Sequence, residues 1–160
     1  HPEVSVEAST SETLPALLAE WFPILLENKA KYGVKPTHTL EELLRLNELV
    51  PELMQLFVLR VNSEAVAGSL LFLANKRVAL IFYHMLRYAF DAYKPIYLLM
   101  DQVTEWAKQH GYAFVDIGVS QDTSDANPMT PALSLINFKE KFDSRGLLRS
   151  TLSKQYPGGE

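Results

Sequence analysis

Three apolar runs, rich in β-branched and aromatic residues, follow one another in the middle of the chain. They cover residues 56–61, 65–73 and 78–86, and short polar breaks separate them at residues 62–64 and 74–77. Apolar runs of this length with short polar breaks are typical of strands joined by turns, so a three-stranded meander is predicted. The third run, "VALIFYHML", is apolar at successive positions and predicts a central strand that is covered on both faces.

Helices are predicted on the N-terminal side of the meander. Residues 9–12 and 39–42 both have the spacing of a capping box, in which Ser or Thr is followed three residues later by Glu. Leucines at helical spacing come after each of them, so one helix is expected to end near Tyr32 and the next near Pro51. A short strand over residues 3–8 is predicted before both helices, because valines alternate there with polar residues.

The chain after the meander alternates between helix and strand patterns. Pro95 opens an amphipathic helix, and residues 112–119, "YAFVDIGV", predict a strand that lies parallel to the preceding one. A polar loop over residues 119–131 leads to a helix that ends within residues 136–146, and a last strand is predicted over residues 147–156. The order is β-α-α-β-β-β-α-β-α-β, which predicts a mixed α+β fold with a mostly antiparallel central sheet flanked by helices.

The totals limit the class of protein. At 160 residues, with 48% hydrophobic and 21% charged residues, the chain is expected to form one domain over residues 1–160. Because it begins with His1 rather than Met, that domain can also be the C-terminal half of a longer tandem protein. We find no apolar run of the length that a membrane span needs, and the absence of cysteine fits a cytoplasmic location. A formal net charge of -4 does not favour broad nucleic-acid binding.

Two motifs point to a family. Residues 98–118, "LLMDQVTEWAKQHGYAFVDIG", combine a helix ending in W-A-x-x-x-G with a strand ending in D-x-G, and residues 138–142 read "FKEKF". In this order of elements, the motifs resemble the GNAT N-acyltransferase fold and, within it, the Fem-type branch of peptidoglycan-bridge aminoacyltransferases. The resemblance implies direct transfer of an acyl or aminoacyl group from acyl-CoA (acetyl-CoA included) or aminoacyl-tRNA to a primary amine of a small molecule or peptide. It implies no permanently bound cofactor, and because many Fem-type proteins carry two such domains, a homodimer is a further expectation.

The chain also departs from the family pattern. GNAT enzymes that use acetyl-CoA typically carry R/Q-x-x-G-x-G/A between the fourth strand and the next helix, where backbone N–H groups receive the pyrophosphate. Residues 90–99 read "FDAYKPIYLL" at this place and contain no glycine. Tyr93, Lys94 and Tyr97 are expected either to hold the donor or only to cover the helix N-terminus. The departure favours an alternative function, a catalytically silent GNAT-like module that binds a ligand or dimerises.

Lys139 is the leading catalytic candidate. Acyl transfer to an amine needs positive charge or N–H groups where the tetrahedral oxygen becomes negative. The resemblance places a Phe-Lys pair, here Phe138 and Lys139, near the acyl-transfer centre. The helical pattern alone gives an alternative interpretation, a solvated lysine beside a stripe of packing residues.

Asp116, Tyr83 and His84 are the other catalytic candidates. Asp116 lies near the end of an apolar strand, where burial would raise the pKa of its carboxyl group towards that of a useful general base. The alternative is a carboxylate that is hydrogen-bonded to the following loop. Tyr83 and His84 are neighbours on one strand and are expected to point to opposite faces of the sheet. For His84, a core histidine with one hydrogen bond is the alternative to a general base. The four histidines lack H-x-x-x-H spacing, so no metal site is expected.

Overall fold

The computed structural model describes residues 2–122, 125–127, 129–148 and 154. The chain divides into two compact units, His1–Gly118 and Val119–Glu160, and each is described by itself. The predicted order of elements is confirmed as far as the last helix. The last predicted strand, over residues 147–156, lies outside the described residues except for Leu147, Leu148 and Lys154, which are not in a strand. The expectation of a single domain stays a prediction.

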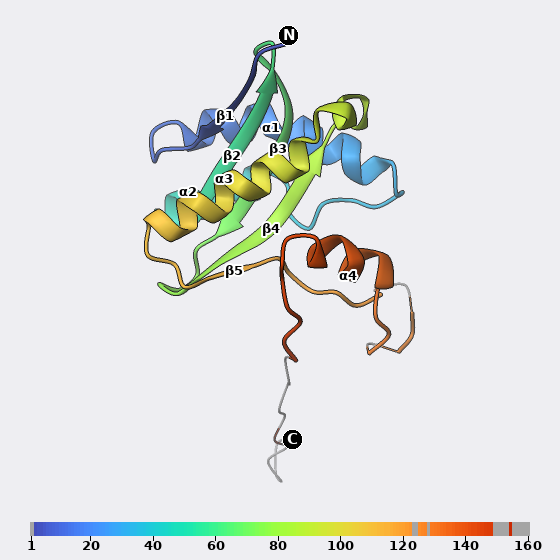
Figure 1. Ribbon diagram of the computed structural model, residues 1–160. Coiled ribbons are helices and arrows are strands. Elements are labelled where there is room, and N and C mark those ends of the chain that lie inside the picture. Colours follow the sequence, from blue (N-terminus) through green and yellow to red (C-terminus); the bar gives the residue numbers. More distant parts are fainter. Residues whose placement is uncertain (1, 123–124, 128, 149–153, 155–160) are drawn as a thin grey trace. The chain divides into compact units, whose positions relative to one another are not determined.

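The first unit is built on one five-stranded sheet in the order β1-β2-β3-β4-β5 (Figure 1). The strands are β1 (Val4–Ala8), β2 (Met54–Val61), β3 (Glu64–Phe72), β4 (Val78–Leu86) and β5 (Phe114–Asp116). Strands β1 to β4 are antiparallel neighbours, and β5 lies parallel to β4. The predicted mixed and mostly antiparallel sheet is therefore confirmed, although β5 is shorter than the strand predicted over residues 112–119.

A two-residue turn joins β2 and β3. Its residues, Asn62 and Ser63, have positive φ angles of 48° and 70°, and such turns match the twist of paired strands. The Asn62 side chain also accepts a hydrogen bond from the Glu3 backbone N–H at 3.0 Å, and the Asn62 backbone N–H donates to the Glu3 carbonyl at 2.9 Å. This turn therefore holds the start of β1 as well as the meander.

Helices cover the two faces of the sheet (Figure 1). On one face lie α1 (Leu14–Ala30) and α2 (Leu40–Leu49), and on the other lies α3 (Pro95–Gln109), which the short 3-10 helix η1 (Tyr88–Tyr93) precedes. The core on the α1 side is made of apolar side chains from α1, α2 and the sheet, which include Leu18, Trp21, Leu25, Leu43, Val58, Leu70 and Tyr83. On its own face, α3 buries Leu99, Val103 and Ala107, as the helical pattern predicts.

Only one of the two predicted capping boxes forms. At the start of α2, the Thr39 N–H donates to the Glu42 carboxylate at 2.8 Å, and the Glu42 N–H donates to the Thr39 hydroxyl at 3.2 Å. The box predicted over residues 9–12 is wrong, because the N-cap of α1 is Thr13. Ser9 instead accepts a hydrogen bond from the Leu56 N–H at 2.9 Å, so its hydroxyl anchors the chain after β1 to β2.

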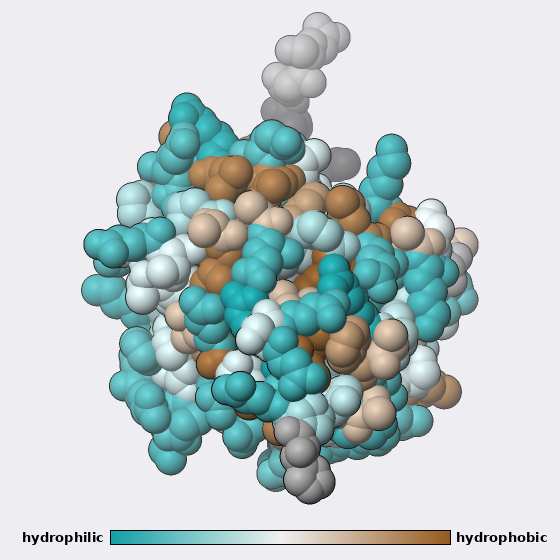
Figure 2. All heavy atoms as spheres, turned by 90° about the horizontal axis from the view of Figure 1, so that it is seen from above, coloured by the Kyte–Doolittle hydropathy of each residue, from teal (hydrophilic) through white to brown (hydrophobic). Residues whose placement is uncertain are grey.

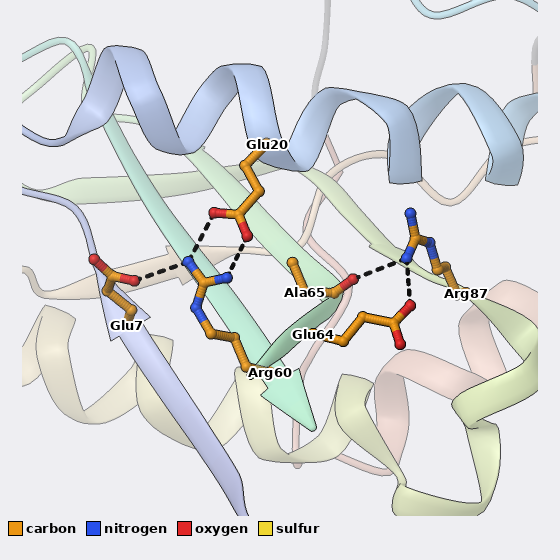
Figure 3. Close-up of polar contacts among 6 residues, drawn as sticks. All are labelled: Glu7, Glu20, Arg60, Glu64, Ala65 and Arg87. Carbon is orange, nitrogen blue, oxygen red and sulfur yellow. Dashed lines mark hydrogen bonds and ion pairs between the residues drawn. The ribbon is translucent and has the colours of Figure 1, made fainter. Parts of the chain in front are cut away.

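Two arginines join the elements at the surface of the first unit (Figure 3). Arg60 on β2 bonds to Glu20 on α1 and to Glu7 on β1, and Arg87 after β4 bonds to Glu64 on β3. The hydrogen bonds from Arg60 hold the pKa of Glu20 below its ordinary value, while partial burial opposes this shift. Because these carboxylates are partly exposed, each pair is expected to add no more than about 1 kcal/mol to stability.

The surface is mainly hydrophilic in the view from above, with hydrophobic residues in smaller groups between the polar ones (Figure 2). Among the residues that the structure describes, no helix combines the length and the apolar character that crossing a membrane requires.

Gly68 on β3 generates the first prediction. A Cβ atom at this position would lie 2.8 Å from the Phe57 carbonyl oxygen and closer still to the Trp21 ring. Gly68→Ala is therefore expected to lower the free energy of unfolding by about 2 kcal/mol or more, since the Phe57 backbone cannot yield without disturbing β2. Urea unfolding measures the change.

Gly146→Ala is the matched control, because a Cβ atom there meets nothing within 4 Å. Equal stability of Gly68→Ala and the wild-type protein would contradict the close packing of α1 on β3.

Candidate functional site

The candidate site lies along β4, where β5 stops pairing with it. The parallel ladder joins Val78 to Phe114, Ala79 to Val115 and Leu80 to Asp116. Strand β4 continues to Leu86, and no strand in the described part of the chain pairs with residues 81–86 on that side. Among the residues that the structure describes, β4 thus has no strand partner along this edge, and such an edge can bind an extended ligand.

A local turn follows β5. The Asp116 carboxylate accepts a hydrogen bond from the Gly118 backbone N–H at 2.7 Å, and Gly118 has a positive φ of 77°, which glycine adopts without strain. The Asp116 side chain is exposed. The expectation of a buried Asp116 is therefore wrong, and the alternative, a carboxylate bonded to the following loop, is confirmed.

A β-bulge interrupts β4 beside this edge. Tyr83 pairs with Leu70 and Ile81 pairs with Leu71, so Phe82 is the extra residue. Ile81 and Tyr83 are buried, whereas 37% of the Phe82 surface is exposed. The prediction that β4 is covered on both faces is therefore wrong at Phe82, because the bulge turns this ring out of the regular alternation.

Tyr83 points to the α1 side of the sheet. Its side chain is 2% exposed and its ring lies 5.9 Å from that of Trp21, measured between centroids. Its hydroxyl oxygen accepts a hydrogen bond from the His38 backbone N–H at 3.2 Å and lies 3.2 Å from the His38 Nδ1. His38 belongs to the connection between α1 and α2, and sequence reasoning missed it. No local pattern could have found this contact, since 45 residues separate the partners.

His84 points to the opposite face, as expected from its place next to Tyr83. Its Nδ1 lies 2.5 Å from the hydroxyl of the buried Ser69, and its Nε2 is buried without a hydrogen-bond partner among the described residues. Burial lowers the pKa of His84 to about 4, while the backbone of Ile96 opposes this shift. The structure thus shows His84 as a partly buried histidine that is bonded to Ser69, and its role as a general base stays a prediction.

The start of α3 brings Tyr93, Lys94 and Tyr97 to the surface. The Lys94 N–H donates to the Asp91 carbonyl at 2.9 Å, the Tyr97 N–H donates to the Lys94 carbonyl at 3.0 Å, and Pro95 has no N–H. The N–H groups of Lys94 and Tyr97 are therefore already hydrogen-bonded within the turn, and Pro95 supplies none. The Lys94 ammonium forms an exposed ion pair with the Asp91 carboxylate at 3.2 Å. An anion at this helix end would meet side-chain charge rather than a row of N–H groups.

The second unit holds Lys139 on α4 (Leu133–Glu140). Only 8% of the Lys139 surface is exposed, and its Nζ donates to the Val119 carbonyl at 2.6 Å and to the Ser120 hydroxyl at 2.9 Å. The interpretation of Lys139 as a solvated lysine is therefore wrong. Phe138 is half-buried and packs edge-to-face on Phe142, with ring centroids 5.2 Å apart. The catalytic role of Lys139 stays a prediction, because this unit is described by itself.

The candidate residues thus fall into separate places. Tyr83 and His84 lie on opposite faces of β4, Asp116 lies at the end of β5, and Tyr93, Lys94 and Tyr97 lie at the start of α3. Lys139 and Phe138 belong to the other unit. Within the described residues, no group of three or more His, Asp or Glu side chains is placed to hold a metal ion.

The buried His84 makes stability depend on pH. Above about pH 6.5 its imidazole is neutral in the folded and the unfolded chain, so its titration does not affect the free energy of unfolding. Between pH 6.5 and 4 the unfolded chain binds a proton that the folded chain does not bind. We expect this uptake to remove about 2 to 3 kcal/mol of stability by pH 4.5.

Urea unfolding of the wild-type protein and of His84→Asn at pH 7 and pH 4.5 tests this expectation. His84→Asn should lose less stability between the two pH values than the wild-type protein, whatever its stability at pH 7. His110→Asn, at an exposed position on the end of α3, should keep the wild-type loss. Equal losses in wild-type protein and His84→Asn would contradict the shifted pKa.

The two hydrogen bonds of Lys139 predict a structural role in the second unit. Lys139→Ala should release the backbone at Val119 and Ser120, with a cost of about 1 to 3 kcal/mol for the lost hydrogen bonds. Hydrogen exchange followed by mass spectrometry should show exchange at least tenfold faster over residues 119–122. Lys141→Ala removes an exposed lysine of the same segment and should leave this exchange unchanged. Unchanged exchange in Lys139→Ala would contradict the anchoring role.

Comparison with known proteins places these features in a family. A model described as an acetyltransferase (GNAT) domain matches residues 1–126 of the 160. No similar sequence was found among curated proteins.

Solved structures of the same fold cover nearly the whole chain. A possible acetyltransferase from Clostridium difficile 630 is 9% identical, with a TM-score of 0.65 over 97% of this chain and 99% of that one. An aminoglycoside acetyltransferase from an uncultured soil metagenomic sample, in complex with sisomicin, is 13% identical, with a TM-score of 0.63 over 95% and 97%. AAC(6')-Iy in complex with the bisubstrate analogue CoA-S-monomethyl-acetylneamine is 10% identical, with a TM-score of 0.66 over 96% and 99%.

At such low identities these structures show the fold alone, whereas the family match covers more than half of the chain. The departure at the glycine loop does not remove the chain from the family. The chain therefore belongs to the acetyltransferase (GNAT) domain family, and the protein is an enzyme of the N-acetyltransferase class.

Proposed function

We propose that this enzyme transfers an acyl group from acyl-CoA to a primary amine by direct attack, and that the donor lies along the edge of β4 beyond Leu80. The observation that carries the proposal is the early end of the parallel ladder, because β5 pairs with Val78–Leu80 only. We also propose, on the motifs "WAKQHGYAFVDIG" and "FKEKF", that the chain belongs to the Fem-type branch.

The edge of β4 beyond Leu80 suits the chemistry of an acyl-CoA. The arm that joins the thioester to the nucleotide carries amide groups, which can bond to strand backbone as an added strand does. Residues 81–86 of β4 supply N–H and C=O groups for this pairing. An arm held there would keep the acyl carbon in one place while the neutral amine attacks it.

The phosphates of the donor would need side-chain charge at the start of α3. Lys94 is the candidate, because its ammonium is exposed while the backbone N–H groups of Lys94 and Tyr97 are already bonded. Tyr93 and Tyr97 are 38% and 40% exposed and can contact the nucleotide beside it. Asp91 competes for Lys94, so the ion pair between them would weaken the contact with phosphate.

We further propose Lys139 as the group that stabilises the negative oxygen of the tetrahedral intermediate. The support is the match of Phe138 and Lys139 to the Fem-type signature. The hydrogen bonds of its Nζ to Val119 and Ser120 support a fixed position for the ammonium group. A fixed charge stabilises a developing oxyanion better than a mobile one.

Acyl-CoA is a better proposal than aminoacyl-tRNA on the charge of the chain. A tRNA needs many phosphate contacts, and the formal net charge is -4. The acceptor is proposed to be a primary amine on a small molecule or a peptide.

Calorimetric titration with acetyl-CoA and with longer acyl-CoAs tests the proposal. We expect micromolar binding to the wild-type protein, binding at least fivefold weaker to Lys94→Ala, and tighter binding to Asp91→Asn, since this change frees the Lys94 ammonium. Lys108→Ala, on the last turn of α3, is the matched control and should bind as the wild-type protein does.

The same variants separate the outcomes. No binding of any acyl-CoA would overturn the proposed donor, and binding of an aminoacyl-tRNA in its place would assign that molecule as the donor. Equal affinity of Lys94→Ala, Asp91→Asn and the wild-type protein would overturn the placement of the phosphates.

A further inference from the structure

An aromatic cluster, formed by His38, Phe72 and Phe82, lies in front of Tyr83 at the bulge of β4. The ring centroids of Phe72 and Phe82 are 4.8 Å apart, those of His38 and Phe82 are 5.3 Å apart, and those of His38 and Phe72 are 5.8 Å apart. All three side chains are at least partly exposed. These rings therefore form a surface that a ligand can reach.

Tyr83 holds this cluster in place from below. Its ring lies 4.9 Å from the Phe82 ring and 6.1 Å from the His38 ring, and its hydroxyl fixes both the backbone and the imidazole of His38. Because Tyr83 is itself buried against Trp21, the position of the cluster is set by the core. A surface held in this way needs little reorganisation to bind a ligand.

The cluster lies next to the edge that the proposed function uses. Phe82 is two residues beyond Leu80, the last residue of β4 that pairs with β5. Phe82 would therefore lie beside the acyl carbon of a donor that is bound on this edge. The acceptor has to approach this same stretch of β4 to attack.

The cluster offers aromatic faces rather than charged groups. The centroid of the Tyr83 ring, which packs against Phe82 at 4.9 Å, lies 6.0 Å from the Lys29 ammonium. The three rings themselves suit a neutral and planar group, which stacks on aromatic faces.

We propose that His38, Phe72 and Phe82 form the acceptor site and select amines that carry an aromatic or other planar group beside the reacting nitrogen. The proposal rests on the proposed function for the identity of the ligand as the acceptor. The recognition of a planar amine by the rings does not depend on the donor.

Binding of 2-phenylethylamine and of ethylamine to the full chain, without donor, tests the site. Titrations followed by saturation-transfer NMR should show binding of 2-phenylethylamine at least fivefold tighter than that of ethylamine. Phe82→Leu keeps an apolar side chain without the ring and should remove most of this difference. Tyr83→Phe keeps the packing on Trp21 but loses the bonds to His38, and it should weaken 2-phenylethylamine alone.

Phe114→Leu is the control for nonspecific binding to an exposed ring, because Phe114 is 58% exposed on β5 and lies outside the cluster. It should leave both affinities unchanged. Circular dichroism checks that each variant is folded, and the His38→Ala variant repeats the test from the loop side if Phe82→Leu does not fold.

Two results would overturn the acceptor site. One is equal binding of the two amines to the wild-type protein, and the other is a preference that survives in both Phe82→Leu and His38→Ala. The acyl-CoA titration tests the donor separately. Ring-dependent amine binding without acyl-CoA binding would sink the proposed donor and leave the site, whereas acyl-CoA binding without ring-dependent amine binding would sink the site alone.

Discussion

The position of α1 on the sheet depends on the absence of a side chain at Gly68. The Trp21 ring lies in the space where a Cβ atom on β3 would stand, so the helix approaches the strand more closely than any other residue would allow. The segment that follows α1 returns to the sheet at His38, whose backbone N–H donates a hydrogen bond to the Tyr83 hydroxyl. Because Thr39 caps α2 directly afterwards, the second helix is also placed by this contact.

The bulge at Phe82 and the end of the β4–β5 ladder lie at neighbouring positions on β4. The last pair of the ladder joins Leu80 to Asp116, and Phe82 is the extra residue two positions further along. A bulge disrupts regular pairing and increases the twist of its strand. The same short stretch of β4 therefore carries the partly exposed Phe82 ring and the edge on which the proposed donor depends.

Sequence patterns predicted the fold well because its information is local. The hydrophobic runs, the Thr39 capping box and Pro95 at the start of α3 each act within a few residues, and all three are confirmed. The capping box at Ser9 does not form, because the Ser9 hydroxyl accepts a hydrogen bond from the Leu56 N–H on β2 instead. A pattern in the helix alone carries no information about that partner.

The candidate site was less predictable for the same reason. The period of two correctly separated Tyr83 from His84. The continuous apolar run wrongly predicted that β4 is covered on both faces, since a bulge leaves no signal in such a run. The burial of Lys139 could not be predicted either, because its partners, Val119 and Ser120, lie at the start of the long polar loop, about 20 residues earlier in the chain. His38 was overlooked, since its role depends on a contact 45 residues away.

The start of α3 shows how a helix can keep its place while its anion-binding backbone is lost. Lys94 has a positive φ of 52°, and its backbone N–H donates to the Asp91 carbonyl. Pro95 fixes the backbone of the first helical turn but has no N–H to donate. The charged group for an anion at this end is the Lys94 ammonium, which already pairs with the exposed Asp91 carboxylate. Attraction of this kind is weak and is screened by salt. A donor bound here would therefore owe most of its affinity to the part that lies on the edge of β4 rather than to its phosphates.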